Sequence, residues 1–476
     1  MPPMTDAPTF SAAELLKATG GIPLRGAEDW SCHGISTDTR TLEPGNLFVA
    51  LAGERFDGHD CLDEAARKGA AGLIVRSDRF GKLAAQGPPA IGVPETLDAL
   101  GAIARVWRGR FSVPLVAITG SSGKTTTKEM LTAIASLSRK VLATTGNLNN
   151  QIGLPQTLFG LRTEHELVIV EMGTNSPGEI AKLAAIAAPN IGLITNIGPA
   201  HLEGLGSLEA VREEKGSLFK AMNGRGTAIL NHDDEMIGLL ARRWQGDSIR
   251  FGLRAGADIT ATRIESASME GSRFNLIVGG IGIPVRLGVA GQHNVLNALA
   301  AAAAATALGF DRHEIAGGLA RFRPVPGRME IRALGNGAFL IIDTYNANPA
   351  SVLEALKTLQ GLRGTGRAVA ILGDMLELGE RAPELHAWIG AKIVETAVDK
   401  VFLKGDLSRS TAAGATTAGL AGERIAFFDD PRSVVRSLQD HLAKGDWILV
   451  KGSRRMKMEK VAEAIIQAFD LSPQRV

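Results

Sequence analysis

Short apolar runs recur along the chain, and each is followed by a glycine-rich or polar turn and then by a stretch with helical spacing. Between residues 111 and 325 these runs include "VPLVAITG", "ELVIVEMG", "IGLITNIGPAH" and "GTAILNHDD". A strand that is apolar at consecutive positions is buried on both faces, which is typical of a parallel sheet covered by helices. The pattern predicts a doubly wound parallel α/β domain in the middle of the chain.

Two further α/β units flank this domain. Residues 1–110 contain the helix-like "SAAELLKATG" and "TLDALGAIARVWRG" and, between them, the strand-like "NLFVAL" and "AAGLIV". After an alanine-rich helix, "FRPVPGRMEI" carries two prolines and a glycine, which favours a hinge. Strand-like runs then resume with "AFLIID", "RAVAILG", "DKVFLKG" and "DWILVKGS". We therefore expect an α/β protein with three domains, over 1–110, 111–325 and 326–476.

The charge balance and the cysteines narrow the class of partner. The formal net charge is +2 and no long basic or acidic run occurs, so small molecules are expected rather than nucleic acid or an anionic membrane. Cys32 and Cys61 have a spacing that matches no metal knuckle, which suits a reducing compartment. The apolar run at 298–308 is too short to cross a bilayer, and the N-terminal segment lacks the pattern of a signal peptide. We expect a soluble cytoplasmic protein that acts as a monomer.

The segment "VAITGSSGKTTTKEM" has the form of a phosphate-binding loop, with an apolar strand, a Gly-Ser turn and a helix. It departs from the G-x-x-x-x-G-K-T pattern because Ile118 stands where the first glycine is usual. Backbone N–H groups and the positive helix end would face an anion, the lysine would reach terminal phosphates, and the first threonine hydroxyl would hold magnesium. An ordinary glycine-rich turn is the alternative. The predicted phosphate-binding residues are Gly120, Ser121, Ser122, Gly123, Lys124, Thr125 and Thr126.

Two polar residues follow neighbouring predicted strands. Glu171 closes "ELVIVE" and His201 follows "GLITNIG". The carboxyl ends of parallel strands share one edge of a sheet, where such folds bind ligands, so both side chains are expected near the loop. An acid at that edge can hold magnesium directly or through water. Each residue taken singly could equally be a polar residue of a surface loop.

Lys215 lies on the apolar face of a predicted helix. In "SLEAVREEKGSLFKAM", Leu208, Val211, Leu218 and Met222 recur at steps of three and four, and Lys215 falls on that stripe. A lysine there must extend its ammonium group to solvent, form a pair, or lose its charge. The sharper hypothesis is that a desolvated neutral amine reacts with carbon dioxide, and that the carbamate adds an anionic ligand for a second magnesium ion. Both interpretations stay open on the sequence alone.

Taken together, these motifs resemble the Mur ligases over nearly the whole chain. The resemblance rests on "TGSSGKTTTKEM", "TTGNLNNQIGLPQTL", "VIVEMGTNSPGEI", "TNIGPAHLEGLGSLEAVREEKGSLF", "GQHNVLNALAAAA", "VPGRMEI", "DTYNANPAS", "LGDMLELG" and "VKGSR". This family uses a G-x-x-G-K-T loop, so Ile118 conforms to the family pattern. The resemblance implies a central P-loop-type domain between a small N-terminal α/β domain and a C-terminal Rossmann-like domain.

The resemblance also implies ATP-dependent amide formation with two magnesium ions in peptidoglycan precursor synthesis. The motifs are most similar to those of the family member that joins D-Ala-D-Ala to UDP-MurNAc-tripeptide through an acyl phosphate. Position by position, Lys124, His201 and carbamylated Lys215 would be catalytic, and Thr125 and Glu171 would complete the metal ligands. Asn297 would contact adenine, and Arg328 and Asp343 would bring the third domain onto the nucleotide. The implied substrate contacts are Thr39, Arg40, Asn149, Asn150, Tyr345, Asn346 and Asn348.

One departure and several alternatives remain. Ile342 precedes Asp343 where related sequences usually carry a second acid, which puts only indirect contacts in doubt. The preceding ligase of the pathway carries a D-N-P-R signature, whereas "DDPR" at 429–432 has the form of a helix start. A folylpolyglutamate synthetase would share the central domain but would not explain the first. A P-loop phosphotransferase or a nucleotide switch is the alternative from a different class.

Overall fold

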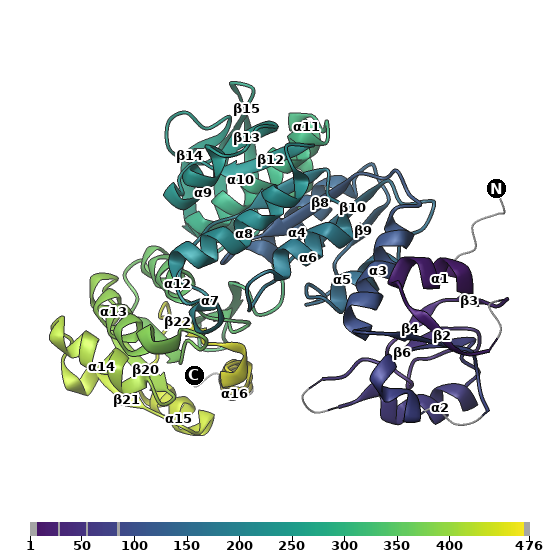
Figure 1. Ribbon diagram of the computed structural model, residues 1–476. Helices are drawn as coiled ribbons and strands as arrows, with labels where there is room; N and C mark the ends of the chain where they lie inside the picture. The colour runs from purple at the N-terminus through teal and green to yellow at the C-terminus, as the bar shows by residue number, and fades with distance from the viewer. Residues whose placement is uncertain (1–6, 27–28, 54–55, 83–85, 471–476) are drawn as a thin grey trace.

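The computed structural model describes residues 7–26, 29–53, 56–82 and 86–470. Three large β-sheets follow one another along the chain, each with its own helices, and Figure 1 shows them as separate bodies. The central body, blue to teal, lies between the purple N-terminal body and the green-to-yellow C-terminal body. Among the described residues, no helix combines the length and the apolar character that a bilayer crossing requires.

The first sheet has five strands in the order β2-β7-β6-β5-β4, and a small antiparallel pair, β1-β3, lies beside it. Its strands are mostly parallel, because only β2 runs antiparallel to its neighbour. The elements of this body are β1 (Thr9–Ser11), α1 (Ala12–Thr19), β2 (Ile22–Arg25), β3 (Ser31–His33), β4 (Ile35–Ser36), β5 (Leu47–Val49), α2 (Leu62–Arg67), β6 (Gly72–Arg76), β7 (Ala90–Val93) and α3 (Thr96–Arg108).

The central sheet has nine strands in the order β16-β15-β14-β13-β12-β11-β8-β10-β9. Its strands are β8 (Leu115–Thr119), β9 (Val141–Ala143), β10 (Leu167–Glu171), β11 (Ile191–Ile194), β12 (Thr227–Asn231), β13 (Asp247–Phe251), β14 (Ile259–Ser268), β15 (Gly271–Val278) and β16 (Ile281–Leu287). Its helices are α4 (Lys124–Ala135), α5 (Gly153–Phe159), α6 (Glu179–Ala187), α7 (Leu202–Leu205), α8 (Leu208–Met222), α9 (Glu235–Ala241), α10 (Gln292–Ala307) and α11 (Arg312–Arg321).

The parallel core of this sheet is confirmed, and an antiparallel extension joins it that the sequence reading missed. Strands β8 to β13 pair in parallel, whereas β14, β15 and β16 form an antiparallel meander. In the meander, buried and exposed positions alternate, as along β16, because one face packs on α10 and α11. Alternation of this kind is typical of half-buried strands. Runs of consecutive apolar residues, from which the strands were predicted, identify only strands that are buried on both faces.

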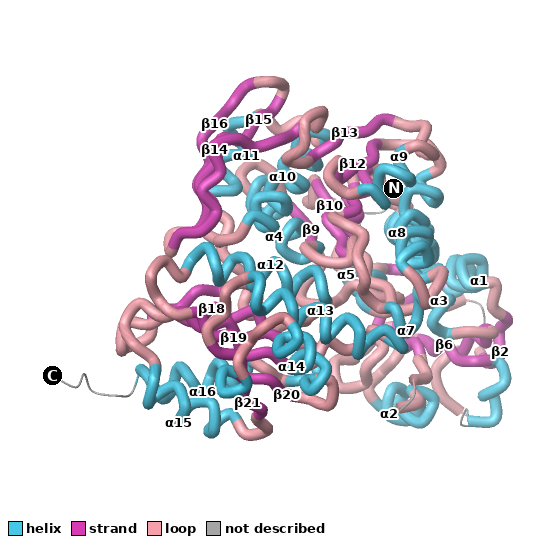
Figure 2. Tube along the Cα trace, turned by 90° about the vertical axis from the view of Figure 1, so that its left-hand side faces the viewer, coloured by secondary structure: helices cyan, strands magenta, loops and turns pink. Residues whose placement is uncertain are grey.

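The third sheet has the order β17-β18-β22-β19-β20-β21 and is parallel except for β17. In Figure 2, α12 lies between this sheet and the central body, and it contacts α10 and β14. Asp430 caps α15 and Pro431 takes its first position, as the sequence predicted for the "DDPR" segment. The elements are β17 (Glu330–Ala333), β18 (Phe339–Asp343), α12 (Pro349–Leu362), β19 (Ala368–Gly373), α13 (Ala382–Glu395), β20 (Lys400–Lys404), α14 (Ser408–Thr417), β21 (Ile425–Phe427), α15 (Pro431–His441), β22 (Trp447–Lys451) and α16 (Glu459–Asp470).

The alanine-rich helix α10 packs closely against α4, the helix that begins at the phosphate loop. Its alanines from 298 to 305 are fully buried. Small side chains let two helix backbones approach, and a well-packed interior has few voids that could admit a larger residue. The position of α4, and therefore of the loop at its N-terminus, depends on this packing.

We predict that Ala302→Leu destabilises the central body by about 1–3 kcal/mol, because the added atoms must force α10 away from its neighbours. Thermal unfolding of the purified protein measures the effect. Ala413→Leu is the matched control, since Ala413 is an exposed alanine within α14. Equal unfolding midpoints for the two variants would contradict the prediction, because they would mean that a leucine fits at position 302 without displacing α10.

Candidate active site

The phosphate loop lies at the carboxyl end of β8, between Thr119 and Lys124. Gly123 caps α4 with φ +80°, and a Cβ atom there would lie 2.2 Å from Oδ1 of Asn297. Residues after β11 hold the turn: the Ser121 hydroxyl donates to the carbonyl of Gly198 at 2.9 Å, and the Ser122 N–H donates to Oδ1 of Asn196 at 3.0 Å. The loop is a fixed cradle of backbone N–H groups at a helix N-terminus, which suits a phosphate.

Lys124 points back over this cradle. Its Nζ donates to the carbonyl of Gly120 at 2.8 Å. Burial of the ammonium group lowers the pKa of Lys124, and the positive charge of Arg328 lowers it further, while Glu171 opposes the shift. Lys124 and Arg328 therefore place positive charge beside the loop. An anion above the loop would balance this charge.

Glu171 connects three predicted residues. One carboxylate oxygen accepts from the Thr125 hydroxyl at 2.7 Å, and the other accepts from the side-chain amide of Asn149 at 2.8 Å. The carboxylate is 3% exposed, so these donors replace the water it has lost. A hydroxyl beside a carboxylate under a phosphate loop is a donor set that magnesium prefers, because that ion keeps several waters and binds one or two carboxylates together with phosphate oxygens. The residues present therefore fit a magnesium ion.

Lys215 is buried, which excludes the interpretation that its ammonium group reaches solvent. Its exposure is 1%, and among the described residues it has no hydrogen-bond partner. Burial lowers its pKa to about 7, with repulsion from Lys124 as the next cause. Its neighbour Glu214 accepts from the N–H groups of Gly178 and Ile180, so that carboxylate is already used to hold the start of α6. A large neutral fraction of the Lys215 amine follows at neutral pH.

Residues from the third body reach the phosphate loop. Nη2 of Arg328 donates to the Thr125 hydroxyl at 3.0 Å, and its guanidinium lies 4.0 Å from the ring centroid of Tyr345. Nδ2 of Asn348 donates to the carbonyl of Ser121 at 3.3 Å, while its Oδ1 caps α12 by accepting from Ser351. The hinge arginine and the helix cap therefore join the two bodies at the site itself.

Asp343 has a partner that the sequence reading missed. Its carboxylate lies 2.5 Å from Nζ of the buried Lys451, which also donates to the carbonyl of Asn346. One feature of the sequence could have indicated this pair. Lys451 ends β22, and in the parallel pairing of β22 with β18 it lies opposite Asp343. His293 was missed as well, and its Nδ1 is buried without a partner among the described residues. Both side chains line the same cavity as the loop.

A cavity of about 780 Å³ between the central and third bodies collects most of the predicted residues. Gly120, Lys215, Thr39 and Arg40 do not line it. Lys215 is still close enough to Lys124 for the charge of Lys124 to lower the pKa of Lys215. The predicted residues that line the cavity are Ser121, Ser122, Gly123, Lys124, Thr125, Thr126, Asn149, Asn150, Glu171, His201, Asn297, Arg328, Asp343, Tyr345, Asn346 and Asn348.

The two predicted residues of the first body lie elsewhere, near β4 and α2. The Thr39 hydroxyl donates to Glu64 at 2.9 Å, and the Thr39 carbonyl accepts from Lys68. The exposed Arg40 pairs with Asp38. Thr39 is therefore held in its turn by hydrogen bonds to α2 and the residue after it, and the Arg40 guanidinium lies at the surface.

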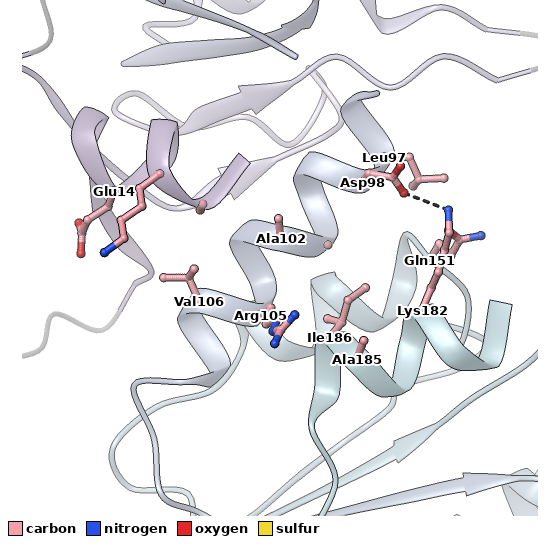
Figure 3. A pocket seen from close by; sticks show the side chains of 13 residues that line it. Glu14, Leu97, Asp98, Ala102, Arg105, Val106, Gln151, Lys182, Ala185 and Ile186 are labelled. Atoms are coloured by element: carbon pink, nitrogen blue, oxygen red, sulfur yellow. Dashed lines mark hydrogen bonds and ion pairs between the residues drawn. The ribbon is translucent and has the colours of Figure 1, made fainter. Parts of the chain in front are cut away.

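A second cavity, of about 640 Å³, lies between α1, α3 and α6 (Figure 3). Its floor includes Ala102 and Ile186, and the pair of Lys182 and Asp98 closes one end at 3.1 Å. It contains none of the predicted site residues. This second cavity lies where the first and central bodies meet. The candidate site is the larger cavity, between the central and third bodies.

Comparison with known proteins decides the family. The Mur ligase middle domain matches residues 118–305, the Mur ligase, glutamate ligase domain matches 327–454, and the Mur ligase family, catalytic domain matches 31–108. A UDP-N-acetylmuramoyl-tripeptide–D-alanyl-D-alanine ligase from Synechocystis sp. is 40% identical over 445 residues, which cover 92% of this chain and 93% of that protein. The chain belongs to the Mur ligase family.

Solved structures of Mur ligases share the fold. MurF from Acinetobacter baumannii matches with a TM-score of 0.87 at 31% identity, over 97% of this chain and 100% of that one. MurF from Thermotoga maritima in complex with ADP matches with a TM-score of 0.80 at 30% identity, over 92% and 97% of the two chains. The resemblance read from the motifs and the three-domain Mur ligase architecture are confirmed.

We predict that Gly123→Ala destabilises the protein more than Gly178→Ala does. Both glycines cap helices with left-handed backbones, φ +80° and +87°, so alanine costs about 1 kcal/mol of strain at either position. Only at 123 must the new Cβ displace Asn297, which is held by Asn294 and Thr127, at a further cost of about 1 kcal/mol. Thermal unfolding of the two variants measures the difference, and equal losses would mean that Asn297 moves aside freely.

Proposed function

We propose that this Mur ligase joins D-Ala-D-Ala to UDP-MurNAc-tripeptide at the expense of ATP, in the synthesis of peptidoglycan precursors. The observation that carries the proposal is the cavity in which the phosphate loop of the central domain faces Arg328, Tyr345 and Asn348 of the third domain. The names of the most similar relatives, and the ADP bound to the related Thermotoga maritima protein, support the same reaction.

The reaction has to bring anionic groups together. A carboxylate oxygen of the tripeptide attacks the γ-phosphorus of ATP, and ADP departs, which leaves an acyl phosphate. The amine of D-Ala-D-Ala then attacks the acyl carbon, inorganic phosphate leaves, and the amine proton is released. Lys124, Arg328 and the N-terminus of α4 are the chain's own means of attracting and orienting the phosphates.

Magnesium, when bound, would neutralise phosphate charge and orient the oxygens for transfer. Thr125 and Glu171 would hold one ion, and His201 with carbamylated Lys215 a second. The neutral Lys215 amine would add to carbon dioxide and release one proton, which leaves a carbamate with one negative charge; an ammonium group would first have to lose a further proton. The burial of Lys215 and its lowered pKa support this chemistry, because only the neutral amine is a nucleophile.

The substrates would meet at the mouth of this cavity. Asn149 and Asn150 would face the sugar and peptide of the precursor, although Oδ1 of Asn150 also accepts from the N–H groups of Ile152 and Gly153. Tyr345, Asn346 and Asn348 would border the dipeptide. Asn297 would contact the adenine and Asp343 would act from the third domain, while Thr39 and Arg40 would hold the uridine diphosphate.

We assign the precursor's nucleotide to residues 1–110, ATP to 111–325, and closure on ATP together with the dipeptide acceptor to 326–476. The protein would work as a cytoplasmic monomer. The preceding ligase is disfavoured as an alternative because the "DDPR" segment caps α15 and does not line the cavity. A phosphotransferase or nucleotide switch would not need a second substrate-binding body joined to the phosphate loop.

The decisive assay is phosphate release from ATP with magnesium, UDP-MurNAc-tripeptide and an acceptor. We predict release that needs D-Ala-D-Ala and is lost in Lys124→Ala, because the phosphates lose their central cation, while the exposed Lys140→Ala retains it. Release with a single amino acid on the dipeptide-linked precursor would move the protein one step earlier. Release without an acceptor would indicate a switch.

We predict that Lys215→Ala lowers ligase activity by roughly 10- to 100-fold, the usual effect of losing a group that supports a metal site. Short-chain carboxylic acids should restore part of it, because their carboxylate can occupy the space of the carbamate. Lys220→Ala on the same helix is the control, since that side chain is 59% exposed. Activity that neither falls nor recovers would remove the carbamate from the mechanism.

A further inference from the structure

A loop of the third domain reaches across to α7 of the central domain. It runs from Asp374 to Gly379, after β19, and its Glu377 carboxylate lies 2.7 Å from Nδ1 of His201. The backbone supports the same contact, because the N–H of Glu203 donates to the carbonyl of Glu377 at 3.1 Å. Gly379 approaches so closely that a Cβ atom there would lie 3.3 Å from Cα of Glu203. The proposed function gives Glu377 no role.

The loop is held firmly from its own side. The N–H of Leu376 donates to the Ser453 hydroxyl at 2.8 Å, and the N–H of Met375 donates to Nε2 of the buried His386 at 3.0 Å. Glu377 itself has φ +64°, a left-handed conformation that costs a residue other than glycine free energy. Residues in such conformations persist where the surrounding structure fixes them. Hydrogen bonds to the neighbouring residues therefore hold the turn that carries the Glu377 carboxylate.

His201 is positioned in the same way on the opposite side. It caps α7 with φ +56°, and its side chain is 19% exposed and lines the cavity with Lys124, Thr125 and Glu171. Among the described residues, Glu377 is the only hydrogen-bond partner of the His201 side chain. An ionised carboxylate can only accept, so Nδ1 must be the donor. In the neutral imidazole with this tautomer, Nε2 carries the lone pair.

We propose that Glu377 is a positioning residue for His201. By accepting the Nδ1–H bond, it fixes the imidazole in the tautomer whose Nε2 can act as a ligand or acceptor in the cavity. Because Glu377 belongs to the third domain, His201 acquires this state only when the two domains meet. The inference rests on the proposed function for its catalytic consequence, and the carboxylate–imidazole contact is the observation that carries it. Carboxylates that hold a ligating histidine in this way are a general means of tuning metal sites.

The tautomer can be measured directly, without substrates or metal. Histidine labelled with ¹⁵N in the full chain, followed by NMR through a pH series until the imidazole signals stop moving at high pH, reports which nitrogen carries the proton in the neutral ring. The signal of His201 is assigned by its absence in His201→Ala. We expect the Nδ1–H form in the wild type and in Glu377→Gln, whose amide oxygen still accepts, and loss of that preference in Glu377→Ala. Glu380→Ala is the control, because Glu380 is exposed in the short helical turn, Gly379–Arg381, that follows the loop.

Kinetics separates positioning from simple stability. Glu377→Ala should raise the magnesium concentration needed for half-maximal activity by about 10- to 100-fold, while the KM for D-Ala-D-Ala and the thermal midpoint stay near those of Glu380→Ala. A wild type that shows no ligase activity, with a tautomer that still depends on Glu377, would reject the proposed function and keep the positioning contact. An unchanged tautomer in Glu377→Ala would overturn the inference, whatever the activity.

Discussion

Repulsion between anionic oxygens is the constraint on which the central cavity depends. A phosphoryl group can reach a carboxylate only where positive charge offsets both, and the chain gathers cations for this purpose: Lys124 on the loop, Arg328 at the hinge, Lys451 at a strand end. Lys451 is balanced by Asp343, whereas the positive charge of Lys124 helps to lower the pKa of the buried Lys215. In the proposed reaction, these cations would offset the negative charge that the substrates bring.

The joint between the central and third domains follows from the same constraint. The polar contacts at the cavity come from Arg328 to Thr125, from Asn348 to Ser121, and from Glu377 to His201. The joint also contains the apolar packing of α12 on α10 and β14. In the proposed reaction, bound phosphates that attract Arg328 would strengthen it. In the proposed reaction, substrate binding and closure of the third domain would be coupled through charge.

Part of the candidate site could be predicted from residues that are neighbours in the sequence. The strand, Gly-Ser turn and helix around Lys124 are adjacent in sequence, so their geometry follows from short-range rules, and the helical stripe placed Lys215 correctly on a buried face. Thr125 was predicted at a helix start and Glu171 at a strand end, and Asn149 was a substrate contact implied by the family resemblance. Their direct hydrogen bonds were not predicted, because side-chain distances depend on how β8, β10 and the turn after β9 are packed.

The sequence by itself determined the three α/β units, the phosphate loop and the family, because apolar periodicity and short motifs record local backbone geometry and ligand chemistry. It missed the antiparallel meander β14 to β16, whose alternating pattern has a different period from that of the buried strands. It also missed Lys451 and Glu377, whose side-chain partners Asp343 and His201 lie more than a hundred positions away, and His293, which lines the same cavity. Only the tertiary structure decided those partners, because a hydrogen bond depends on distance in space and nothing in the chain's local order fixes that distance.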